Sequence, residues 1–145
     1  MSERIGENML RILYDMQCQI LAKGKDTDAL LAILSAAAAR LSGKPGFALL
    51  FYDIPTQASR IRFNSGLRGE LLNGFSEKFT EARNGGDPLT MEILPLQDDE
   101  KIFFIPIGEE TTPFGVLLIA KPAERDVEGI DEYRQIATDA ITKFM

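Results

Sequence analysis

The sequence predicts an α+β fold in which helices cover both faces of an antiparallel sheet. Two apolar runs, residues 102–107 and 114–120, indicate the centre of that sheet, and six polar and turn residues join them into a hairpin. Neither run alternates polar with apolar residues, so both faces of these strands must be covered. Apolar residues at helical spacing precede and follow the strands, and these segments supply the cover.

Two helices are expected before the sheet. Within residues 3–23, apolar side chains recur at alternating spacings of four and three, which predicts an amphipathic helix with coiled-coil character. A second helix is expected over residues 28–41, with Asp26 or Thr27 as its cap. A glycine and proline break then leads into the first strand.

The remaining strands are arranged by how polar their faces are. Residues 47–52 form a third apolar strand, whereas residues 60–65 alternate, with Ile61 and Phe63 expected to point inward and Arg62 outward. Residues 90–94 form a weaker strand. Short hairpins and central apolar strands together predict a five- to six-stranded sheet in the order 2-1-5-4-3.

Helices are expected on both faces of this sheet. Residues 67–83 form a helix over one face, and the helices before the sheet share the other with a last helix over residues 127–145, capped by Asp126. Neither an internal repeat nor an interdomain linker interrupts the chain. Residues 1–145 are therefore expected to form a single domain.

The order of elements, the run FFIPI (residues 103–107) and the run PFGVLLIAKP (residues 113–122) resemble the GAF domains of signalling proteins. That resemblance implies a ligand cavity between the sheet and the crossing helix. It also implies that the terminal helices, residues 1–23 and 127–145, pair two protomers and pass a signal to an adjoining output domain. A PAS-like or roadblock-like fold is the structural alternative.

Aromatic residues are the candidates to line such a cavity, since ligand pockets are mostly apolar with a few polar groups. The helix 67–83 contributes two phenylalanines, and the strands contribute three. Phe103 is an alternative to Phe104, and two polar residues complete the set. The predicted ligand-binding residues are Phe51, Phe63, Phe75, Phe79, Phe104, Ser65 and Arg83. Ordinary core packing of these phenylalanines is the alternative interpretation.

Composition excludes most cofactors and catalytic machinery. The chain has no histidine and one cysteine, Cys18, so we expect no histidine-ligated haem, no zinc site and no serine or cysteine triad. Asp53-Ile54-Pro55 resembles the DIP motif of phytochromes, but it falls in an expected turn and Cys18 is far from it, so no bilin is expected. We expect no metal site, no catalytic residue and no enzymatic activity.

Charge and hydropathy limit the partners and the location. The net charge of -6 argues against nucleic-acid binding. No segment approaches the length of a membrane span, and the N-terminus lacks a signal-peptide pattern, so we expect a cytoplasmic protein. The chain stops inside its last expected helix, which favours a sensor domain excised from a longer protein, with a complete short protein as the alternative.

The terminal helices are the expected dimer interface. A helix as long as residues 3–23 packs only part of its surface on one small core, so its apolar stripe and the end of the last helix are predicted to pair two copies. The predicted interface residues are Ile5, Met9, Ile12, Met16, Ile141 and Phe144. Packing of both helices within the chain is the alternative.

The functional prediction is a regulatory sensor domain that binds a small molecule, mediates dimerisation, or does both. A ligand-free docking or dimerisation module, whose cavity its own phenylalanines fill, is the alternative. An enzyme that uses only carboxylates and hydroxyls, such as the acidic run Asp98, Asp99 and Glu100, is the least favoured reading.

Overall fold

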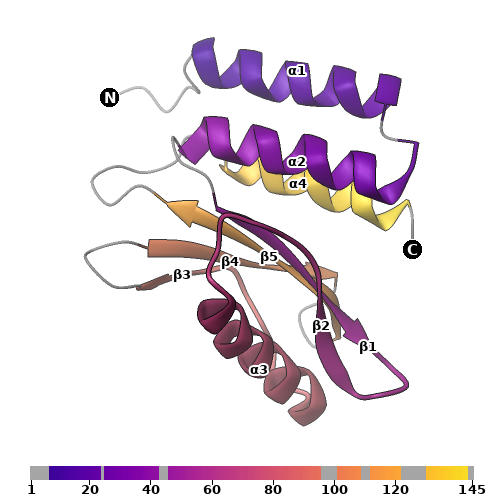
Figure 1. Ribbon diagram of the computed structural model, residues 1–145, viewed down its shortest axis with the longest axis vertical. Coiled ribbons are helices and arrows are strands. Elements are labelled where there is room, and N and C mark those ends of the chain that lie inside the picture. The colour runs from indigo at the N-terminus through magenta and orange to yellow at the C-terminus, as the bar shows by residue number, and fades with distance from the viewer. Residues whose placement is uncertain are drawn as a thin grey trace.

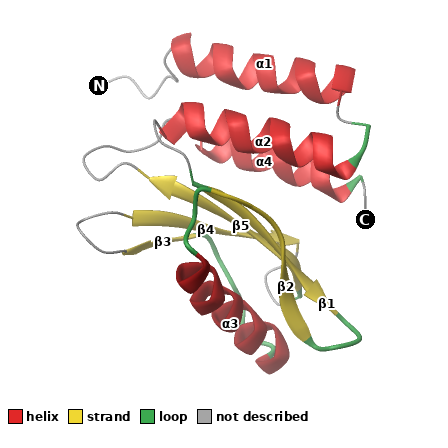
Figure 2. Cartoon of the chain, in the orientation of Figure 1, coloured by secondary structure: helices red, strands yellow, loops and turns green. Residues whose placement is uncertain are grey.

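Five strands form one antiparallel sheet in the described part of the computed structural model, and helices lie on both of its faces (Figure 1). The structure describes residues 7–23, 25–42, 46–95, 101–108, 112–121 and 130–143. The helices are α1 (Glu7–Lys23), α2 (Thr27–Ser42), α3 (Gly69–Gly85) and α4 (Ile130–Thr142), and the strands are β1 (Phe47–Asp53), β2 (Ala58–Ser65), β3 (Glu92–Pro95), β4 (Lys101–Gly108) and β5 (Pro113–Lys121). Figure 2 shows how the helices and strands divide into layers.

The strand order is β2-β1-β5-β4-β3, which confirms the order predicted from the sequence. Strands β4 and β5 lie at the centre, where Ile105 is opposite Leu117 and Phe104 is opposite Leu118. These four side chains are fully buried. Both faces of the two strands are covered because their sequences leave no polar face to expose to water.

The two faces of the sheet carry separate hydrophobic cores. On one face, which we call the bundle face, Leu49 and Leu117 pack with α2 and α4. On the other, the α3 face, Leu50 and Leu118 pack with side chains of α3. Neighbouring residues of one strand point to opposite faces, so each central strand contributes side chains to both cores.

The helices of the bundle face form two layers. Helices α2 and α4 lie against the sheet, and α1 contacts both of them from outside (Figure 1). The buried Tyr133 of α4 donates a hydrogen bond of 2.8 Å from its hydroxyl to the carbonyl oxygen of Leu34 in α2. Burial raises the pKa of Tyr133 well above its ordinary value, because the ionised form would lose its hydration.

A β-bulge interrupts the pairing of β1 with β2. Phe63 is opposite Leu49, whereas Ile61 is opposite Leu50, so Arg62 is an extra residue on β2. Phe63 therefore packs on the bundle face, while Ile61 lies on the α3 face and is 44% exposed. The prediction that Ile61 and Phe63 share one inward face is wrong, because the bulge shifts the alternation.

Local sequence explains where α3 ends and where α2 begins. Gly86 follows α3 in a left-handed conformation (φ 71°) and donates its N–H to the carbonyls of Ala82 and Arg83. Asp26 caps α2 by accepting a hydrogen bond of 2.8 Å from the Ala29 N–H.

The acidic run at residues 98–100 and residues 127–129 of the expected last helix lie outside the described residues. Among the helices described, none is both long and apolar enough to cross a membrane.

Candidate functional site

The sheet separates the predicted aromatic cluster into two groups. Phe51 and Phe63 pack against the core of the bundle face, whereas Phe75, Phe79 and Phe104 belong to the α3 face. The prediction of one cavity lined by all five phenylalanines is therefore wrong. The physical reason is strand geometry: alternate positions of β1 and β4 face opposite ways, and apolar residues occupy both sets of positions.

The chain's own side chains occupy the space between α3 and the sheet. Phe79 and Phe104 are fully buried there. The ring of Phe75 lies 6.2 Å from that of Phe104, and the ring of Tyr52 lies 6.1 Å from that of Phe79, measured between centroids. Aromatic pairs at these separations are favourable contacts beyond the area they bury. On the α3 face, the geometry therefore matches a packed core.

The two predicted polar site residues lie at different places. Arg83 stacks its guanidinium 4.5 Å above the Tyr52 ring and donates a hydrogen bond of 3.2 Å to the carbonyl of Pro113. It thereby joins the end of α3 to the start of β5. Ser65 is opposite Phe47, whose side chain belongs to the bundle-face core. The structure does not bring Ser65 and Arg83 together.

A polar groove of about 340 Å³ runs between α3 and the edge strand β2. The Ser59 hydroxyl donates to the Ser76 carbonyl at 2.9 Å, and the Ser59 N–H donates to the Thr80 hydroxyl at 2.9 Å. Glu77 and Glu81 complete the lining. These hydroxyls are paired with one another, so the groove serves to attach α3 to β2. Nowhere in the described residues do three His, Cys, Asp or Glu side chains gather closely enough to hold a metal ion.

Half of the predicted dimer interface lies inside the chain. Ile12, Met16 and Ile141 are at most 3% exposed and belong to the bundle-face core. The prediction that they contact a second copy is wrong, because α1 uses this stripe to pack on α2 and α4. Ile5, Phe144 and the side chain of Met9 lie outside what the structure describes.

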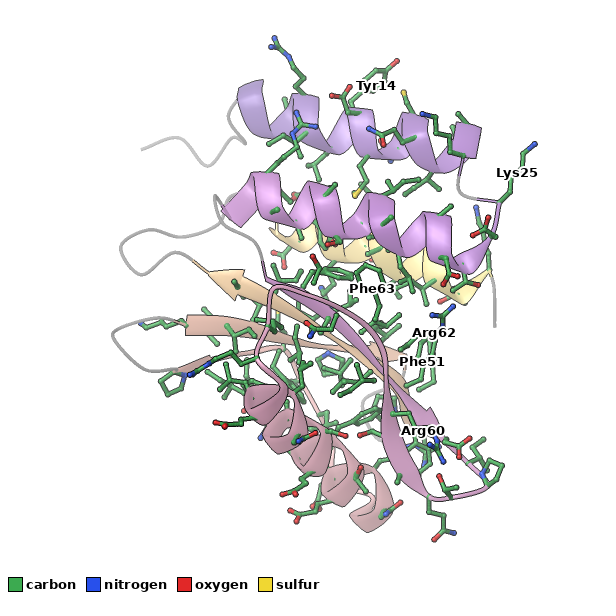
Figure 3. The ribbon with its side chains drawn as sticks, viewed as in Figure 1. Tyr14, Lys25, Phe51, Arg60, Arg62 and Phe63 are labelled. Carbon is green, nitrogen blue, oxygen red and sulfur yellow. The ribbon has the colours of Figure 1, made fainter. Side chains whose placement is uncertain are left out.

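The opposite face of α1 carries a second apolar stripe. Leu10, Tyr14 and Leu21 are 53%, 67% and 82% exposed, and the exposed Cys18 lies between Tyr14 and Leu21. Figure 3 shows Tyr14 pointing away from α2. The side-chain hydrogen bond with Cys18 raises the pKa of Tyr14. The spacings of four, four and three along this stripe are the signal that could have revealed it. We call these four residues the outer stripe.

A groove continues from the outer stripe onto α4. It measures about 490 Å³, and its lining includes Ile136 and Asp139 from α4, Lys143 just after α4, and Gln17 and Ile20 from α1. Tyr14, Cys18 and Leu21 also line this groove, so the outer stripe and the groove adjoin. Helix α1 lies on the side of the molecule farthest from α3 (Figure 1).

No protein-family model matches this chain, and no curated protein does. Solved structures do match. The GAF domain of an Acinetobacter phosphoenolpyruvate-protein phosphotransferase superposes with a TM-score of 0.64 at 13% identity, covering 96% of each chain. Its counterpart from Coxiella burnetii has a TM-score of 0.64 at 16% identity, covering 94% of this chain and 92% of its own.

A third match comes from a signalling protein. The GAF domain of a protein described as a sensor histidine kinase from Pseudomonas syringae pv. tomato has a TM-score of 0.60 at 16% identity. It covers 91% of this chain and 82% of its own. At such identities the similarity lies in the fold, and the fold is GAF-like.

Proposed function

We propose that this GAF-like domain is a regulatory module of a signalling protein and that it pairs with a second copy through the outer stripe of α1. The observation that carries the proposal is the exposure of Leu10, Tyr14 and Leu21 along one line of an outermost helix. Contiguous apolar residues on a surface are typical of interaction sites. The structural neighbours, which are domains of a sensor kinase and of phosphotransferases, support the regulatory role.

The surface suits a symmetric pairing in its size and charge. Helix α1 has 17 residues and is about 25 Å long, so two such helices alone would make a small interface. The adjoining groove adds the exposed side of α4, which gives two helices from each copy. Asp139 and Lys143 in the groove have opposite charges. An isologous contact, in which the same patch meets itself, therefore faces no net repulsion.

The module is proposed to act without catalysis and without haem, bilin or zinc. The absence of histidine from the sequence and its single cysteine support this part of the proposal. Its partners would be a second copy and an output domain, attached to it or separate, in the cytoplasm. On the α3 face, the filled core favours the alternative in which this space holds no ligand.

The test is the mass in solution of matched variants. Size-exclusion chromatography with light scattering at about 50 µM should give twice the 16.1 kDa of one chain. Leu21→Glu should reduce this mass to that of one chain, since a buried unpaired charge strongly disfavours the contact. Ile54→Glu, at a 71% exposed position in the β1–β2 turn, is the control and should remain a dimer. A wild-type monomer, or a dimer that Leu21→Glu leaves intact, would refute the proposed pairing.

A further inference from the structure

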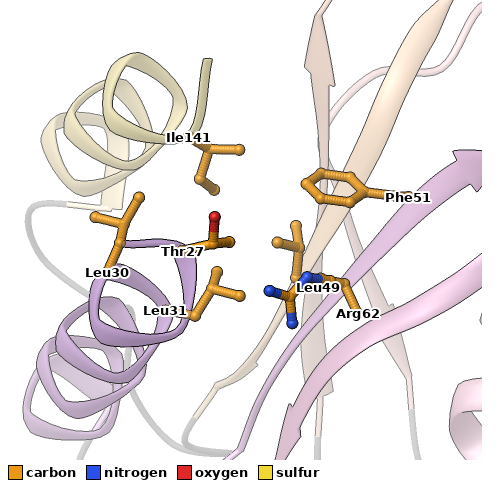
Figure 4. A pocket seen from close by; sticks show the side chains of 7 residues that line it. All are labelled: Thr27, Leu30, Leu31, Leu49, Phe51, Arg62 and Ile141. Atoms are coloured by element: carbon orange, nitrogen blue, oxygen red, sulfur yellow. The ribbon is translucent and has the colours of Figure 1, made fainter. Parts of the chain in front are cut away.

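A pocket of about 220 Å³ lies on the bundle face, where α2, α4 and the sheet meet (Figure 4). Leu31 lines it from α2, Ile141 from α4, and Leu49 and Phe51 from β1. Leu31, Leu49 and Ile141 are buried, and the Phe51 ring forms one wall. Apolar side chains therefore make most of the lining, with Thr27 and Arg62 as its polar members. The volume is roughly seven times the 30 Å³ share of one liquid water.

Among the described residues, Arg62 brings a cation to the lining of this largely apolar pocket. Arg62 is the residue that the bulge inserts between Phe63 and Ile61, and it lines the pocket although strict alternation would turn it to the α3 face. Bulges re-aim side chains in this way and are frequent beside functional sites. Arg62 and Phe51 both line the pocket (Figure 4). Arg60 is opposite Phe51 in the pairing of β1 with β2, but its Nε atom lies 3.4 Å from Oδ2 of Asp53, and it is not among the described residues that line the pocket.

Arg62 makes an ion pair within the chain, and another carboxylate can replace its partner in that pair. Its Nη2 atom lies 2.9 Å from Oδ1 of Asp28, whose side chain is 83% exposed. Exposed pairs of this kind contribute little net stability. A guanidinium carries five N–H donors in a planar fork, so it can bind a second carboxylate or exchange one for another.

We infer that this pocket binds a small monocarboxylate with an apolar body, whose carboxylate pairs with Arg62. The apolar walls take the body, and the volume limits it to fewer than about ten non-hydrogen atoms. Thr27, at the start of α2, also lines the pocket and offers a hydroxyl to the carboxylate. The N-terminus of this 16-residue helix adds a favourable field for an anion.

The position of the pocket gives its ligand a route to the interface. A molecule between Ile141 and Leu31 contacts α4 and α2 at once, and α1 packs on both of those helices. Occupancy can therefore favour one spacing of α2 and α4, and with it one position of the outer stripe. This inference goes beyond the proposed function, since the pocket lies within one chain and can bind its ligand in a monomer or a dimer.

The test is a titration of the ¹⁵N-labelled protein with benzoate and isovalerate at constant ionic strength. Benzamide and isovaleramide serve as neutral isosteres. At least one acid should give saturable shifts below about 20 mM at the amides of Thr27, Leu31 and Leu49. Its neutral isostere should bind at least about tenfold more weakly, because a neutral amide offers no negative charge to pair with Arg62. Light scattering on the same samples reports the oligomeric state separately.

Two arginine variants locate the interaction. Arg62→Gln should weaken binding of the acid by about tenfold or more. Arg60→Gln, which removes the same charge from the same strand at a 66% exposed position outside the pocket lining, should change it by less than about twofold. The inference is overturned if neither acid saturates, if the shifts map to Phe104 and Leu118 on the α3 face, if the isosteres bind equally well, or if Arg62→Gln binds like wild type.

Discussion

Replacing Tyr133 with phenylalanine tests how α4 is held against α2. The substitution keeps the buried ring and removes only the hydroxyl that donates to the Leu34 carbonyl at 2.8 Å. A hydrogen bond of this kind contributes about 0.5–1.5 kcal/mol net, so Tyr133→Phe should lower the free energy of unfolding by about 1 kcal/mol at pH 7.

The same variant should reverse its effect at high pH. Burial raises the folded-state pKa of Tyr133 well above 10.0, so above pH 10 the unfolded chain releases a proton that the folded chain keeps. The contribution of Tyr133 to the free energy of unfolding is therefore fully present below pH 10. Above pH 10 it declines by about 1.4 kcal/mol for each pH unit. That loss offsets the hydrogen bond of about 1 kcal/mol within roughly one pH unit above 10.

The assay is urea unfolding followed by far-ultraviolet circular dichroism between pH 7 and pH 11. Wild type should be the more stable protein at pH 7, and the two stabilities should converge and cross near pH 11, about one unit above the unfolded pKa. Stabilities that stay parallel across the whole range would refute the buried, neutral Tyr133 described here. A variant that declines more steeply than wild type would refute it as well.

Three further predictions concern the α3 face, the centre of the sheet and the β1–β2 turn. In urea unfolding, Phe79→Ala should cost about 3–5 kcal/mol and Phe75→Ala distinctly less, because only Phe79 is fully buried; equal costs would contradict a packed α3 core. Gly115→Ala should cost about 1–3 kcal/mol, since its Cβ would lie 2.9 Å from a backbone carbonyl of β1; an unchanged midpoint would contradict that close approach. Thr56→Ala should raise the lowered pKa of Asp53, measured by carboxyl NMR, because the Thr56 hydroxyl donates to that carboxylate at 2.6 Å; an unmoved pKa would assign the shift to another cause.

The centre of the sheet was predictable because its sequence leaves few choices. Strands β4 and β5 have no polar face, so they must lie between two layers, and the short hairpins then allow one comfortable strand order. The same property hides which residue faces which layer. Phe103 and Phe104 are both apolar and adjacent, yet one packs on the bundle face and the other on the α3 face.

The faces to which the side chains of edge strand β2 point were predicted wrongly for a different reason. A period of two holds only while the pairing register is regular, and the extra residue Arg62 breaks it. The segment RIRFNS contains no glycine or proline to mark a bulge. Pairing with β1 determines the bulge, so the location of Arg62 on the bundle face could not be predicted from the strand alone.

Helix α1 carries apolar residues on two faces, and sequence periodicity cannot rank them. Ile12 and Met16 form the regular stripe and were expected to meet a second copy, but they pack on α2 and α4. Leu10, Tyr14 and Leu21 are exposed instead. A helix in the outermost layer buries whichever stripe fits the layer beneath it, and that fit is a property of α2 and α4.

The distance between two copies of Cys18 tests the proposed pairing most directly. This cysteine is the single one in the sequence, is exposed, and lies on the outer stripe, so one nitroxide label reports on the surface itself. Helices packed about 8–10 Å apart over their length of about 25 Å should give an inter-label distance below about 40 Å by pulsed electron paramagnetic resonance. Light scattering should show that the labelled protein keeps its dimer mass. A dimer whose labels show no dipolar coupling, or a wild-type protein that remains monomeric, would contradict the pairing through α1.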